Sequence, residues 1–372
     1  ETLSSMRMQI MPLRGRLIRL GICGMLSLLV VFNIFTWTKE KHENCGLWNK
    51  VFFNRDTEII YTNNFSSREM FISLDPFSCP DSSQMIKVWK LGRLGNQMSS
   101  YATLLLLALR LNRYPTIPND LKKNLNKYFS GLSVKSDSEV PLLTHCKLSY
   151  EEYWLELATN INKLNSSMIS TPDKVAEKGI YITGYPDEMT LYGKYSKLLL
   201  GEFSFHDAIV AKGMSIMGNY TTATSKMVAV HVRRTDYMGT LKNVHNGSEF
   251  IGVKYFTKAM NYFREKYRHE KIRFMVFSDD LKWCKKKIVG KDVLFPGDGD
   301  INSPAVDMFL ITQCDHAILT YGTFGFWGAF LGPHQKHGEI VVAANFTPIV
   351  TALEARVPVI DYMKNWHLFT DT

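Results

Sequence analysis

The 372-residue sequence lacks the cysteine and histidine spacings that hold structural zinc. Its six cysteines include no Cys-x-x-Cys pair. No segment of roughly 20 to 50 residues repeats, and glycine and proline occur in ordinary numbers, so solenoid, collagen-like and disordered classes are excluded. Because 45% of the residues are hydrophobic, the chain can bury the core of one large domain or of two lobes.

Positive charge is in excess, but no basic tract is interleaved with aromatic residues. The net charge is +9 and the sequence pI is about 9.1. Four arginines against one acid in the first 19 residues contribute +3 of that charge. The remaining lysines and arginines are dispersed, so we expect no nucleic-acid partner. A basic tail next to an apolar segment indicates membrane topology instead.

An apolar run of 18 residues without a charge, Leu20 to Trp37, follows this tail. It is about the shortest length that spans a bilayer core at roughly 1.5 Å per residue. A cleaved signal peptide is the alternative, but its cleavage site has small residues, whereas TKEKHE follows here. We expect a cytoplasmic tail over residues 1–19, a signal-anchor transmembrane helix over 20–37 and a lumenal body.

Asn-x-Ser/Thr sequons support the lumenal assignment. About one or two would arise by chance in a chain of this length, whereas five are present, at Asn64, Asn165, Asn219, Asn246 and Asn345. The five cysteines after the anchor are odd in number, so at least one is free or pairs between chains in an oxidising compartment. The disulfide pairing and the oligomeric state stay open.

The residues after the anchor divide into a polar stem, 38–84, and a body that begins near Met85. No element is predicted between Thr116 and Asp173. The patterns in the first part of the body predict strands Met85–Leu91 and Gly179–Tyr185 and helices Asn96–Leu111 and Asp187–Leu200.

Apolar strands alternate with amphipathic helices in the second half of the chain. The predicted strands are Lys226–Val232, Ile272–Ser278, Asp292–Phe295, His316–Gly322 and Glu339–Phe346. The predicted helices are Gly252–Tyr267, Asp280–Ile288, Ser303–Gln313 and Thr323–Leu331. Continuous apolar strands alternating with helices indicate a parallel sheet covered on both faces. We therefore predict an α/β fold with a Rossmann-like lobe over 224–372, preceded by a lobe over 85–223.

Charged side chains follow the strands of this expected lobe. Arg233, Arg234 and Asp236 come after one strand, and Asp279 and Asp280 after the next. Ligands of such sheets bind outside the carboxyl ends of the strands, and a guanidinium makes two parallel bonds to phosphate. These residues predict a diphosphate site. Ordinary ion pairs between the arginines and Asp236 or Asp279 fit the sequence equally well.

Four motifs in order resemble the galactoside alpha-1,2-fucosyltransferases of the blood-group H and secretor type, glycosyltransferase family 11. They are GRLGNQM at Gly92–Met98, HVRRTDY at His231–Tyr237, GDG at Gly297–Gly299 and the long run Ser303–Ala329. The resemblance extends from about Met85 to Asn345. It implies a GT-B-like two-lobed glycosyltransferase in the Golgi membrane, with GDP-fucose as the donor substrate and a beta-galactoside glycan as the acceptor.

The resemblance also implies which residues meet the donor. His231, Arg233 and Arg234 correspond to donor-site residues, and the following positions should lie near the nucleotide or face it from the other lobe: Arg93, Gly95, Asn96, Asp279, Asp280, Asp307 and Thr323. Thr235 departs from the usual HVRRGDY and matches alpha-1,6-fucosyltransferases. Leu241 stands where those enzymes have their proposed glutamate base, which weakens the alpha-1,6 interpretation.

The linkages of the family's donor and products imply the reaction mechanism. GDP-fucose has a β linkage and the products have an α linkage, so a single inverting displacement is expected, with negative charge growing on the β-phosphate. Arg233 and Arg234 would stabilise that charge. Asp236 is the candidate base, and bracing Arg233 is its alternative role.

Metal catalysis is the alternative to arginine catalysis. Asp298 and Asp300 spell a DxD pattern that could hold a divalent metal, but Gly and Asp also favour turns for backbone reasons. We expect no cofactor and no metal. A fucosyltransferase of another linkage or acceptor is one rival hypothesis, and an inactive, membrane-tethered glycan- or nucleotide-binding module is the other.

Overall fold

The computed structural model describes residues 51–53, 59–61, 74–155, 177–186, 192–221, 225–237, 251–297, 304–320, 322–332, 338–343 and 365–370. The chain divides into two compact units, residues 1–67 and 68–372. In the first, β1 (Val51–Phe53) pairs antiparallel with β2 (Ile59–Tyr61), inside the expected stem. The expected anchor, 20–37, lies outside the described residues, and none of the helices within them has the length and apolarity of a bilayer span.

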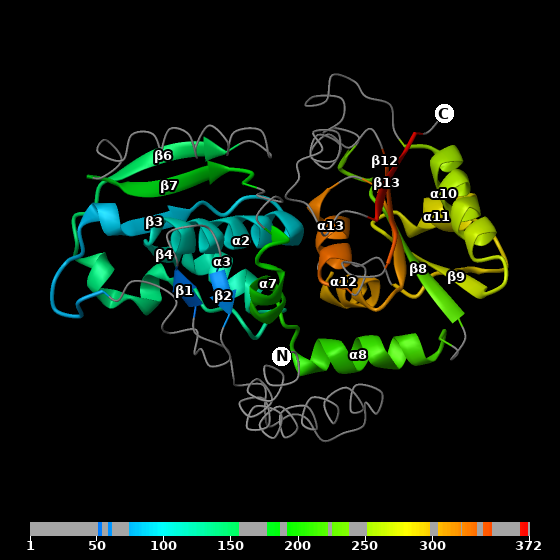
Figure 1. Ribbon diagram of the computed structural model, residues 1–372, viewed down its shortest axis with the longest axis horizontal. Helices are drawn as coiled ribbons and strands as arrows, with labels where there is room; N and C mark the ends of the chain where they lie inside the picture. Colours follow the sequence, from blue (N-terminus) through cyan, green and yellow to red (C-terminus); the bar gives the residue numbers. More distant parts are fainter. Residues whose placement is uncertain are drawn as a thin grey trace, which may run out of the picture. The chain divides into compact units, whose positions relative to one another are not determined.

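A five-stranded parallel sheet forms the first half of the second unit, in the strand order β5-β4-β3-β7-β6 (Figure 1). Its strands are β3 (Met85–Val88), β4 (Tyr114–Ile117), β5 (Lys135–Ser136), β6 (Tyr150–Leu155) and β7 (Gly179–Gly184).

Helix α2 (Leu94–Leu111) packs against β3 and β4. Its leucine-rich sequence is buried almost all round, because one side lies on the sheet and another meets the second half of the unit. Asn112 ends the helix in the left-handed conformation (φ 52°), as residues just past a helix often do. The short helix α3 (Asn119–Leu125) follows β4.

The second sheet has six parallel strands in the order β10-β9-β8-β11-β12-β13. The strands are β8 (Ser225–Val232), β9 (Lys271–Ser278), β10 (Val293–Leu294), β11 (His316–Leu319), β12 (Ile340–Ala343) and β13 (Trp366–Phe369). Numbered along the chain, this order is 3-2-1-4-5-6, that of doubly wound nucleotide-binding sheets. The order reverses between β8 and β11, where such sheets bind their ligands.

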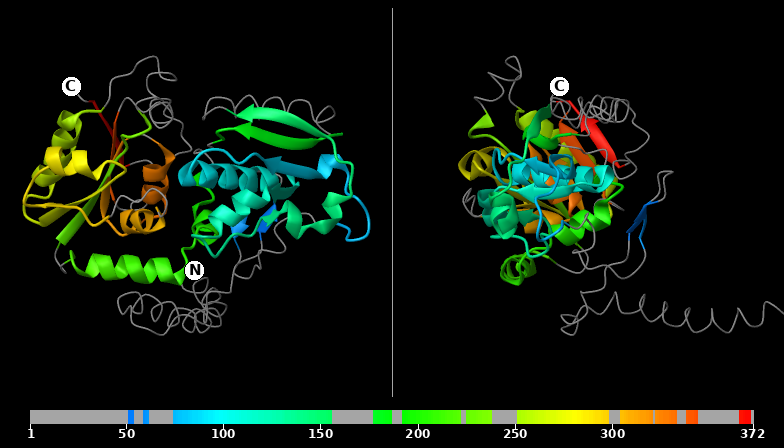
Figure 2. Two further views of the ribbon diagram at one scale, coloured as in Figure 1. Left: turned by 180° about the vertical axis from the view of Figure 1, so that it is seen from behind. Right: turned by 90° about the vertical axis from the view of Figure 1, so that its left-hand side faces the viewer.

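Helices cover both faces of this sheet. Figures 1 and 2 show α10 (Val253–Lys266) and α11 (Leu281–Lys287) on one face and α12 (Ala305–Thr312) and α13 (Thr323–Phe330) on the other. The sequence of α10 explains its position, since its apolar side chains recur at helical spacing and are the buried ones. The predicted α/β fold with parallel sheets is confirmed.

The helices α2 and α13 join the two halves of the second unit. The Trp327 indole on α13 donates to the Ser99 hydroxyl on α2 at 2.9 Å. Trp327 is fully buried and lies 5.0 Å, ring to ring, from both Tyr192 and Phe203. Phe203 follows α7 (Ser196–Glu202). A buried aromatic cluster therefore holds α7, α2 and α13 together.

Helix α8 (Asp207–Gly218) packs against α12. Gly213 permits this approach, because a Cβ there would stand 2.2 Å from the Phe309 ring. Along the chain α8 precedes residue 223, where we expected the first lobe to end. That boundary stays a prediction.

Three expectations about the first half differ from the structure. Helix α2 starts at Leu94, two residues before the expected Asn96. Of the expected helix Asp187–Leu200, residues 187–191 lie outside the described residues, and a turn at 193–195 precedes α7, which begins at Ser196. The stretch from Thr116 to Asp173, where no element was predicted, contains α3, β5 and β6 as well as two short 3-10 helices, Asp137–Glu139 and Pro141–Thr144.

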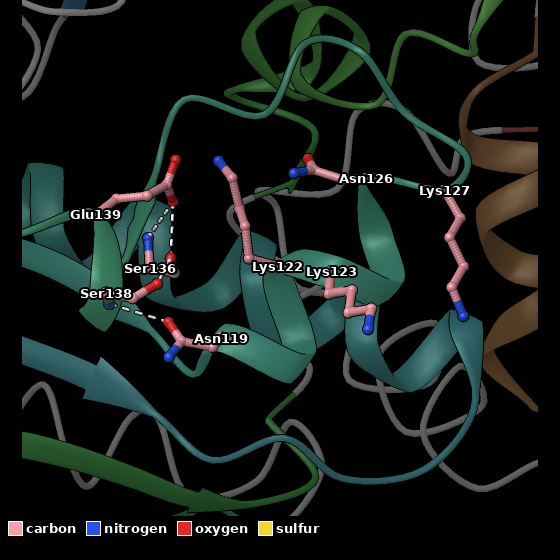
Figure 3. A pocket seen from close by; sticks show the side chains of 8 residues that line it. All are labelled: Asn119, Lys122, Lys123, Asn126, Lys127, Ser136, Ser138 and Glu139. Atoms are coloured by element: carbon pink, nitrogen blue, oxygen red, sulfur yellow. Dashed lines mark hydrogen bonds between the residues drawn. The ribbon is translucent and has the colours of Figure 1, made fainter.

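A cavity of about 370 Å³ lies beside α3 (Figure 3). Lys122 and Glu139 line it, but both are bonded within the protein: the Lys122 ammonium donates to the carbonyls of Leu132 and Val134, and Glu139 accepts from Ser136. None of the residues predicted to bind the donor lines this cavity.

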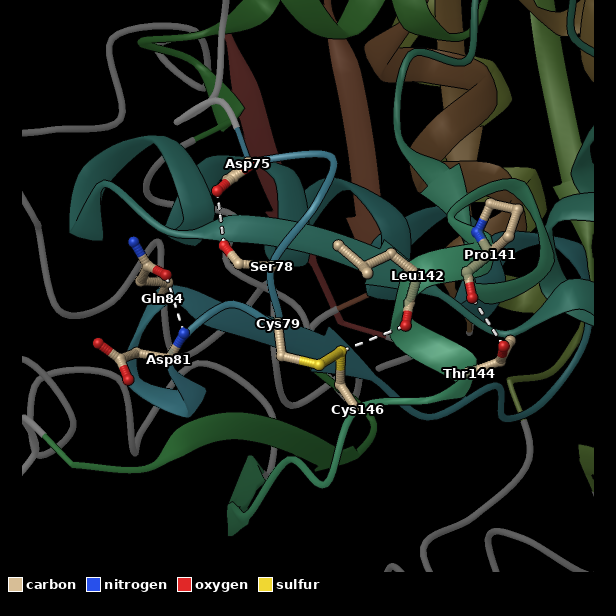
Figure 4. Close-up of a disulfide and its surroundings, with 9 residues drawn as sticks. All are labelled: Asp75, Ser78, Cys79, Asp81, Gln84, Pro141, Leu142, Thr144 and Cys146. Atoms are coloured by element: carbon tan, nitrogen blue, oxygen red, sulfur yellow. Dashed lines mark hydrogen bonds between the residues drawn. A yellow bond between two sulfur atoms is a disulfide. The ribbon is translucent and has the colours of Figure 1, made fainter.

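A disulfide links Cys79 to Cys146 (Figure 4). Cys79 precedes the 3-10 helix Ser82–Gln84, and Cys146 follows the 3-10 helix Pro141–Thr144. The bond therefore ties the chain before β3 to the segment before β6. Cys284 and Cys314 are buried, unpaired thiols.

We expect the double variant Cys79→Ser/Cys146→Ser to unfold more easily. The link joins residues separated by 67 positions, and removing such a link costs about 2 to 4 kcal/mol because the unfolded chain gains freedom. Urea unfolding of the variant and of the oxidised parent measures the difference. Alkylation of Cys79 or Cys146 in urea without reductant would contradict the pairing, whereas Cys284 and Cys314 should react.

Candidate functional site

The carboxyl ends of β9, β8 and β11 lie side by side at one edge of the six-stranded sheet. Arg233 and Arg234 follow β8, Asp279 follows β9 and Thr320 follows β11. The backbone N–H of Arg233 donates to the Thr320 hydroxyl at 3.0 Å, and that hydroxyl donates to the His231 carbonyl at 3.1 Å. The reversal point of the strand order is therefore lined by polar residues.

Asp279 organises the segment that follows β8. Its carboxylate accepts from the backbone N–H of Arg234 at 2.9 Å and from the Thr235 hydroxyl at 2.6 Å. It also pairs with a guanidinium nitrogen of Arg233 at 3.1 Å. Only 3% of this side chain is exposed, and burying a carboxylate is costly unless it has such partners.

The Arg233 guanidinium lies between two carboxylates. Besides Asp279, it contacts Asp236, with N–O distances of 2.6 and 2.8 Å to the two oxygens. Asp236 is 46% exposed, whereas Asp279 is buried. The ion-pair alternative that the sequence left open is thus present in the structure. A phosphate could displace the exposed partner while the buried one continues to hold the guanidinium.

Arg234 is held differently. Its guanidinium lies 3.9 Å above the Trp283 ring, and its Nε is 3.4 Å from the Asp280 carboxylate. Asp280 also accepts from the Trp283 backbone N–H as the N-cap of α11. Stacking of this kind fixes the plane of an arginine fork.

Residues of the GRLGNQM motif meet this edge from α2. The Arg93 guanidinium is 3.3 Å from Asp236, and both side chains are about half exposed. The Thr323 hydroxyl donates to the Asn96 side-chain carbonyl at 2.7 Å. A Cβ on Gly95 would stand 2.5 Å from that hydroxyl, so glycine permits the close approach of α2 to α13.

Thr323 is also the first residue of α13, directly after Gly322. Gly322 has a φ of 87°, a conformation that suits glycine. The N-terminal end of α13 thus follows β11 at the reversal point of the sheet. Helix N-termini favour anions, so the start of α13 is suited to a negatively charged group.

His231 is buried at the end of β8 and lies against Phe324, with ring centres 5.4 Å apart. Burial, with the nearby Arg233 charge, lowers the pKa of this imidazole from its ordinary value to about 4. Its Nδ1 has no hydrogen-bond partner among the described residues. A Cβ on Gly325 would come within 2.5 Å of that nitrogen, so α13 packs directly against the ring.

Asp307 lies on α12, against Gly297, where a Cβ would be 2.6 Å from its carboxylate. The DxD residues Asp298 and Asp300 lie outside the described residues. Within the described residues, no three His, Cys, Asp or Glu side chains are grouped as metal ligands. Of the sequons, Asn219 is exposed at the end of α8, and the other four lie outside the described part of the chain.

The structure therefore brings most of the predicted donor-site residues together. Arg93, Gly95, Asn96 and Thr323 meet at the junction of α2 and α13, while Arg233, Arg234, Asp236, Asp279 and Asp280 form one charged cluster. Sequence reasoning did not single out Thr320, because the predicted strand His316–Gly322 included it whereas β11 ends at Leu319, nor did it predict the stacking of Trp283 on Arg234.

The fold and this cluster define a doubly wound α/β protein with its charged residues at the point where strand order reverses. The family model for glycosyl transferase family 11 matches residues 58–367. The chain belongs to this family and is a glycosyltransferase.

The chain is similar to several named relatives. It is 32% identical over 299 residues to galactoside alpha-(1,2)-fucosyltransferase 2 of Sus scrofa, covering 77% of this chain and 81% of the relative. It is 32% identical to galactoside alpha-(1,2)-fucosyltransferase 1 of Rattus norvegicus over 301 residues, with coverage of 78% and 74%. The galactoside 2-alpha-L-fucosyltransferase Sec1 of Mus musculus is 33% identical over 290 residues, with coverage of 74% and 71%.

Solved structures are more distant. An Arabidopsis thaliana FUT1 mutant in complex with GDP has a TM-score of 0.48 and 12% identity, covering 73% of this chain and 72% of the other. The fucosyltransferase NodZ from Bradyrhizobium has a TM-score of 0.45 and 14% identity, covering 67% of this chain and 92% of the other.

Substitution of Gly95 tests the junction between α2 and α13. Gly95→Ala places a methyl group 2.6 Å from the Phe324 backbone nitrogen, which cannot turn aside as a side chain could. We expect a loss of about 1 to 3 kcal/mol in stability, as for other overpacked sites, measured by thermal unfolding. Gly218→Ala is the matched control, because a Cβ there meets nothing within 4 Å. Equal melting temperatures for the two variants would refute the close contact.

The low pKa of His231 predicts a pH dependence of stability. Below pH 6.5 the His231 imidazole is protonated in the unfolded chain, whereas in the folded protein it is protonated only near pH 4. The contribution of this group to the free energy of unfolding is therefore complete above pH 6.5 and falls as the pH is lowered towards 4. Urea unfolding at several pH values should show this slope in the parent and a shallower one in His231→Gln. The exposed His269→Gln should keep the parental slope. An imidazole that titrates near pH 6.5 by NMR would contradict the prediction.

Proposed function

We propose that this glycosyltransferase transfers L-fucose from GDP-beta-L-fucose to the 2-hydroxyl of a terminal beta-galactose on glycoprotein or glycolipid glycans. The names of its relatives, which are galactoside alpha-(1,2)-fucosyltransferases, support the donor sugar, the acceptor and the linkage. The observation that carries the proposal is the pair Arg233 and Arg234 at the carboxyl end of β8, where the strand order reverses.

In this proposal the two arginines bind the diphosphate and stabilise the charge that grows on its β-phosphate. Arg233 remains anchored by the buried Asp279 while phosphate oxygens replace the exposed Asp236. Arg234, held flat by Trp283, presents its fork without a large loss of side-chain freedom. Such preorganised charges contribute to catalysis because they need no rearrangement when the bond breaks.

Two roles are open to Asp236 in the proposed reaction: it can brace the arginines, or it can act as the base. In the structure its carboxylate bridges Arg93 and Arg233, so it braces the arginines. Once a diphosphate has taken over these guanidinium groups, the carboxylate would be released next to the bound diphosphate. There it would accept the proton of the attacking hydroxyl, and the single displacement would invert the fucose linkage.

We further propose that the reaction needs no metal or cofactor. The support is the number of guanidinium groups at the cluster: when a diphosphate displaces Asp236, Arg93 and Arg233 lose that carboxylate and can bond to the phosphates beside Arg234. The alternative is the DxD residues Asp298 and Asp300, placed in sequence between β10 and α12. We also propose a Golgi type II protein with residues 20–37 as its anchor, supported by the arginine-rich tail and the sequons.

The experiment that tests this function uses the full chain, purified in detergent from eukaryotic cells, with GDP-fucose and a beta-galactoside. We expect fucosylated product with an alpha-1,2 linkage by NMR, at a rate that EDTA does not change. Another linkage would favour the rival acceptor hypothesis, and GDP binding without turnover would favour an inactive module. A rate lost in EDTA and restored by a divalent cation would refute metal independence.

Single substitutions test the arginines. Arg233→Ala and Arg234→Ala should each lower kcat at least about a hundredfold, on the order of 3 kcal/mol, as for other removed charge stabilisers. Arg268→Ala is the matched control, because Arg268 is exposed. Within the described residues, its guanidinium bonds only to the neighbouring His269. Circular dichroism confirms that the variants fold. Near-normal kcat in both arginine variants would refute the assignment.

A further inference from the structure

Aromatic side chains gather on one face of the five-stranded sheet, outside the charged cluster. The register pairs Lys87 of β3 with Tyr181 of β7, and Tyr150 of β6 with Gly179 of β7. Since successive residues of a strand point to opposite faces, Lys87, Tyr181 and Tyr150 share a face. Trp89, two residues after Lys87, continues it, and its backbone N–H donates to the Ile182 carbonyl at 2.8 Å. We name Trp89, Tyr181, Tyr150 and Lys87 the aromatic platform.

The rings of the aromatic platform contact one another, and Trp89 is open to solvent while Tyr150 and Tyr181 are half-buried. Trp89 and Tyr181 have nearly parallel planes, 6° apart, with ring centres at 6.3 Å, and Tyr181 lies 6.4 Å from Tyr150. The Lys87 ammonium sits 4.3 Å above the Tyr150 ring. Despite these contacts, 53% of Trp89 remains exposed. An ordered, exposed tryptophan marks a surface that another molecule can cover.

The polar groups around the rings indicate the chemical class of the molecule that would cover them. Glu152 is opposite Tyr181 in the register and is exposed, so the face that carries the Lys87 ammonium also carries a carboxylate beside the Tyr181 ring. Mixed charge of this kind does not select an anion or a cation. Flat ring surfaces bordered by both hydrogen-bond donors and acceptors instead match a neutral sugar, whose C–H groups pack on rings while its hydroxyls bond to the rim.

The aromatic platform lies close in sequence to the candidate site. Trp89 precedes Arg93 by four residues, which limits the distance between their Cα atoms to about 14 Å, and Arg93 contacts Asp236. That span equals only a few sugar units. A glycan whose terminal galactose lies at the charged cluster would therefore carry its next sugars towards Trp89.

We propose that the aromatic platform is a subsite for the inner sugars of the acceptor glycan, with Trp89 as its main contact; this rests on the proposed function and deepens it. The occupant is a neutral oligosaccharide that continues from the terminal galactose. The subsite binds through apolar contact with the rings and therefore adds affinity for longer acceptors without touching the donor.

Kinetics with a short and a long acceptor test the subsite. The assay compares methyl beta-galactoside with lacto-N-tetraose, a neutral tetrasaccharide that ends in beta-galactose. In Trp89→Ala the KM for the tetrasaccharide should rise about tenfold, the scale of one lost ring contact, while the KM values for the monosaccharide and for GDP-fucose stay unchanged. Trp89→Phe should restore part of the loss. Phe77→Ala, which removes a side chain that is 92% exposed, is the matched control and should behave like the parent.

An unchanged tetrasaccharide KM in a folded Trp89→Ala enzyme would overturn the subsite, and so would an equal loss for both acceptors. If the parent chain transfers fucose to neither acceptor, the proposed function fails, and binding is then measured directly. Saturation-transfer NMR with lacto-N-tetraose should show contacts in the parent that Trp89→Ala loses. Equal signals from the two proteins would overturn the subsite independently of turnover.

Discussion

The site depends on one buried carboxylate. Asp279 directly follows β9. Its carboxylate contacts three groups that follow β8: the guanidinium of Arg233, the backbone N–H of Arg234 and the hydroxyl of Thr235. Because the charge is almost fully shielded from water, the loss of any one donor would leave it partly unpaired. The carboxylate therefore fixes the backbone after β8, and both arginines project from a defined position.

The two aspartates that touch Arg233 differ in what they can do. Asp279 is enclosed and has three partners, so exchanging it for phosphate would strand a buried charge. Asp236 is half exposed, and water can solvate its carboxylate when the ion pair with Arg233 breaks. The same guanidinium is thus bound on one side by a permanent partner and on the other by a replaceable one. This asymmetry reconciles the ion pairs in the structure with a role in binding an anion.

The sequence predicted the parts of the fold whose signals are local. Strands β8 and β9 begin within one residue of their expected starts, because each is a continuous buried apolar run, and the single apolar face of α10 predicted that helix. Strands β5 and β6 had no comparable signal, since they carry exposed residues and their positions depend on pairing with distant strands. At the site, strand ends identified the charged residues, but the connecting role of Asp279 depends on contacts 44 and 45 residues apart. Contact of these residues with a nucleotide stays a prediction.

Packing explains most residues of the GRLGNQM motif, but not Arg93. Gly92 has a φ of 70° and Asn96 lies against it, Gly95 lets α13 approach, and the Gln97 side chain donates to the Gly92 carbonyl at 2.9 Å. Each of these residues has a structural reason to be where it is. Within the described part of the chain, the Arg93 side chain makes one ion pair, its exposed contact with Asp236, and exposed ion pairs contribute little to stability. An anion-binding role of Arg93 between α2 and the end of β8 stays a prediction, and packing does not compete with it as an explanation.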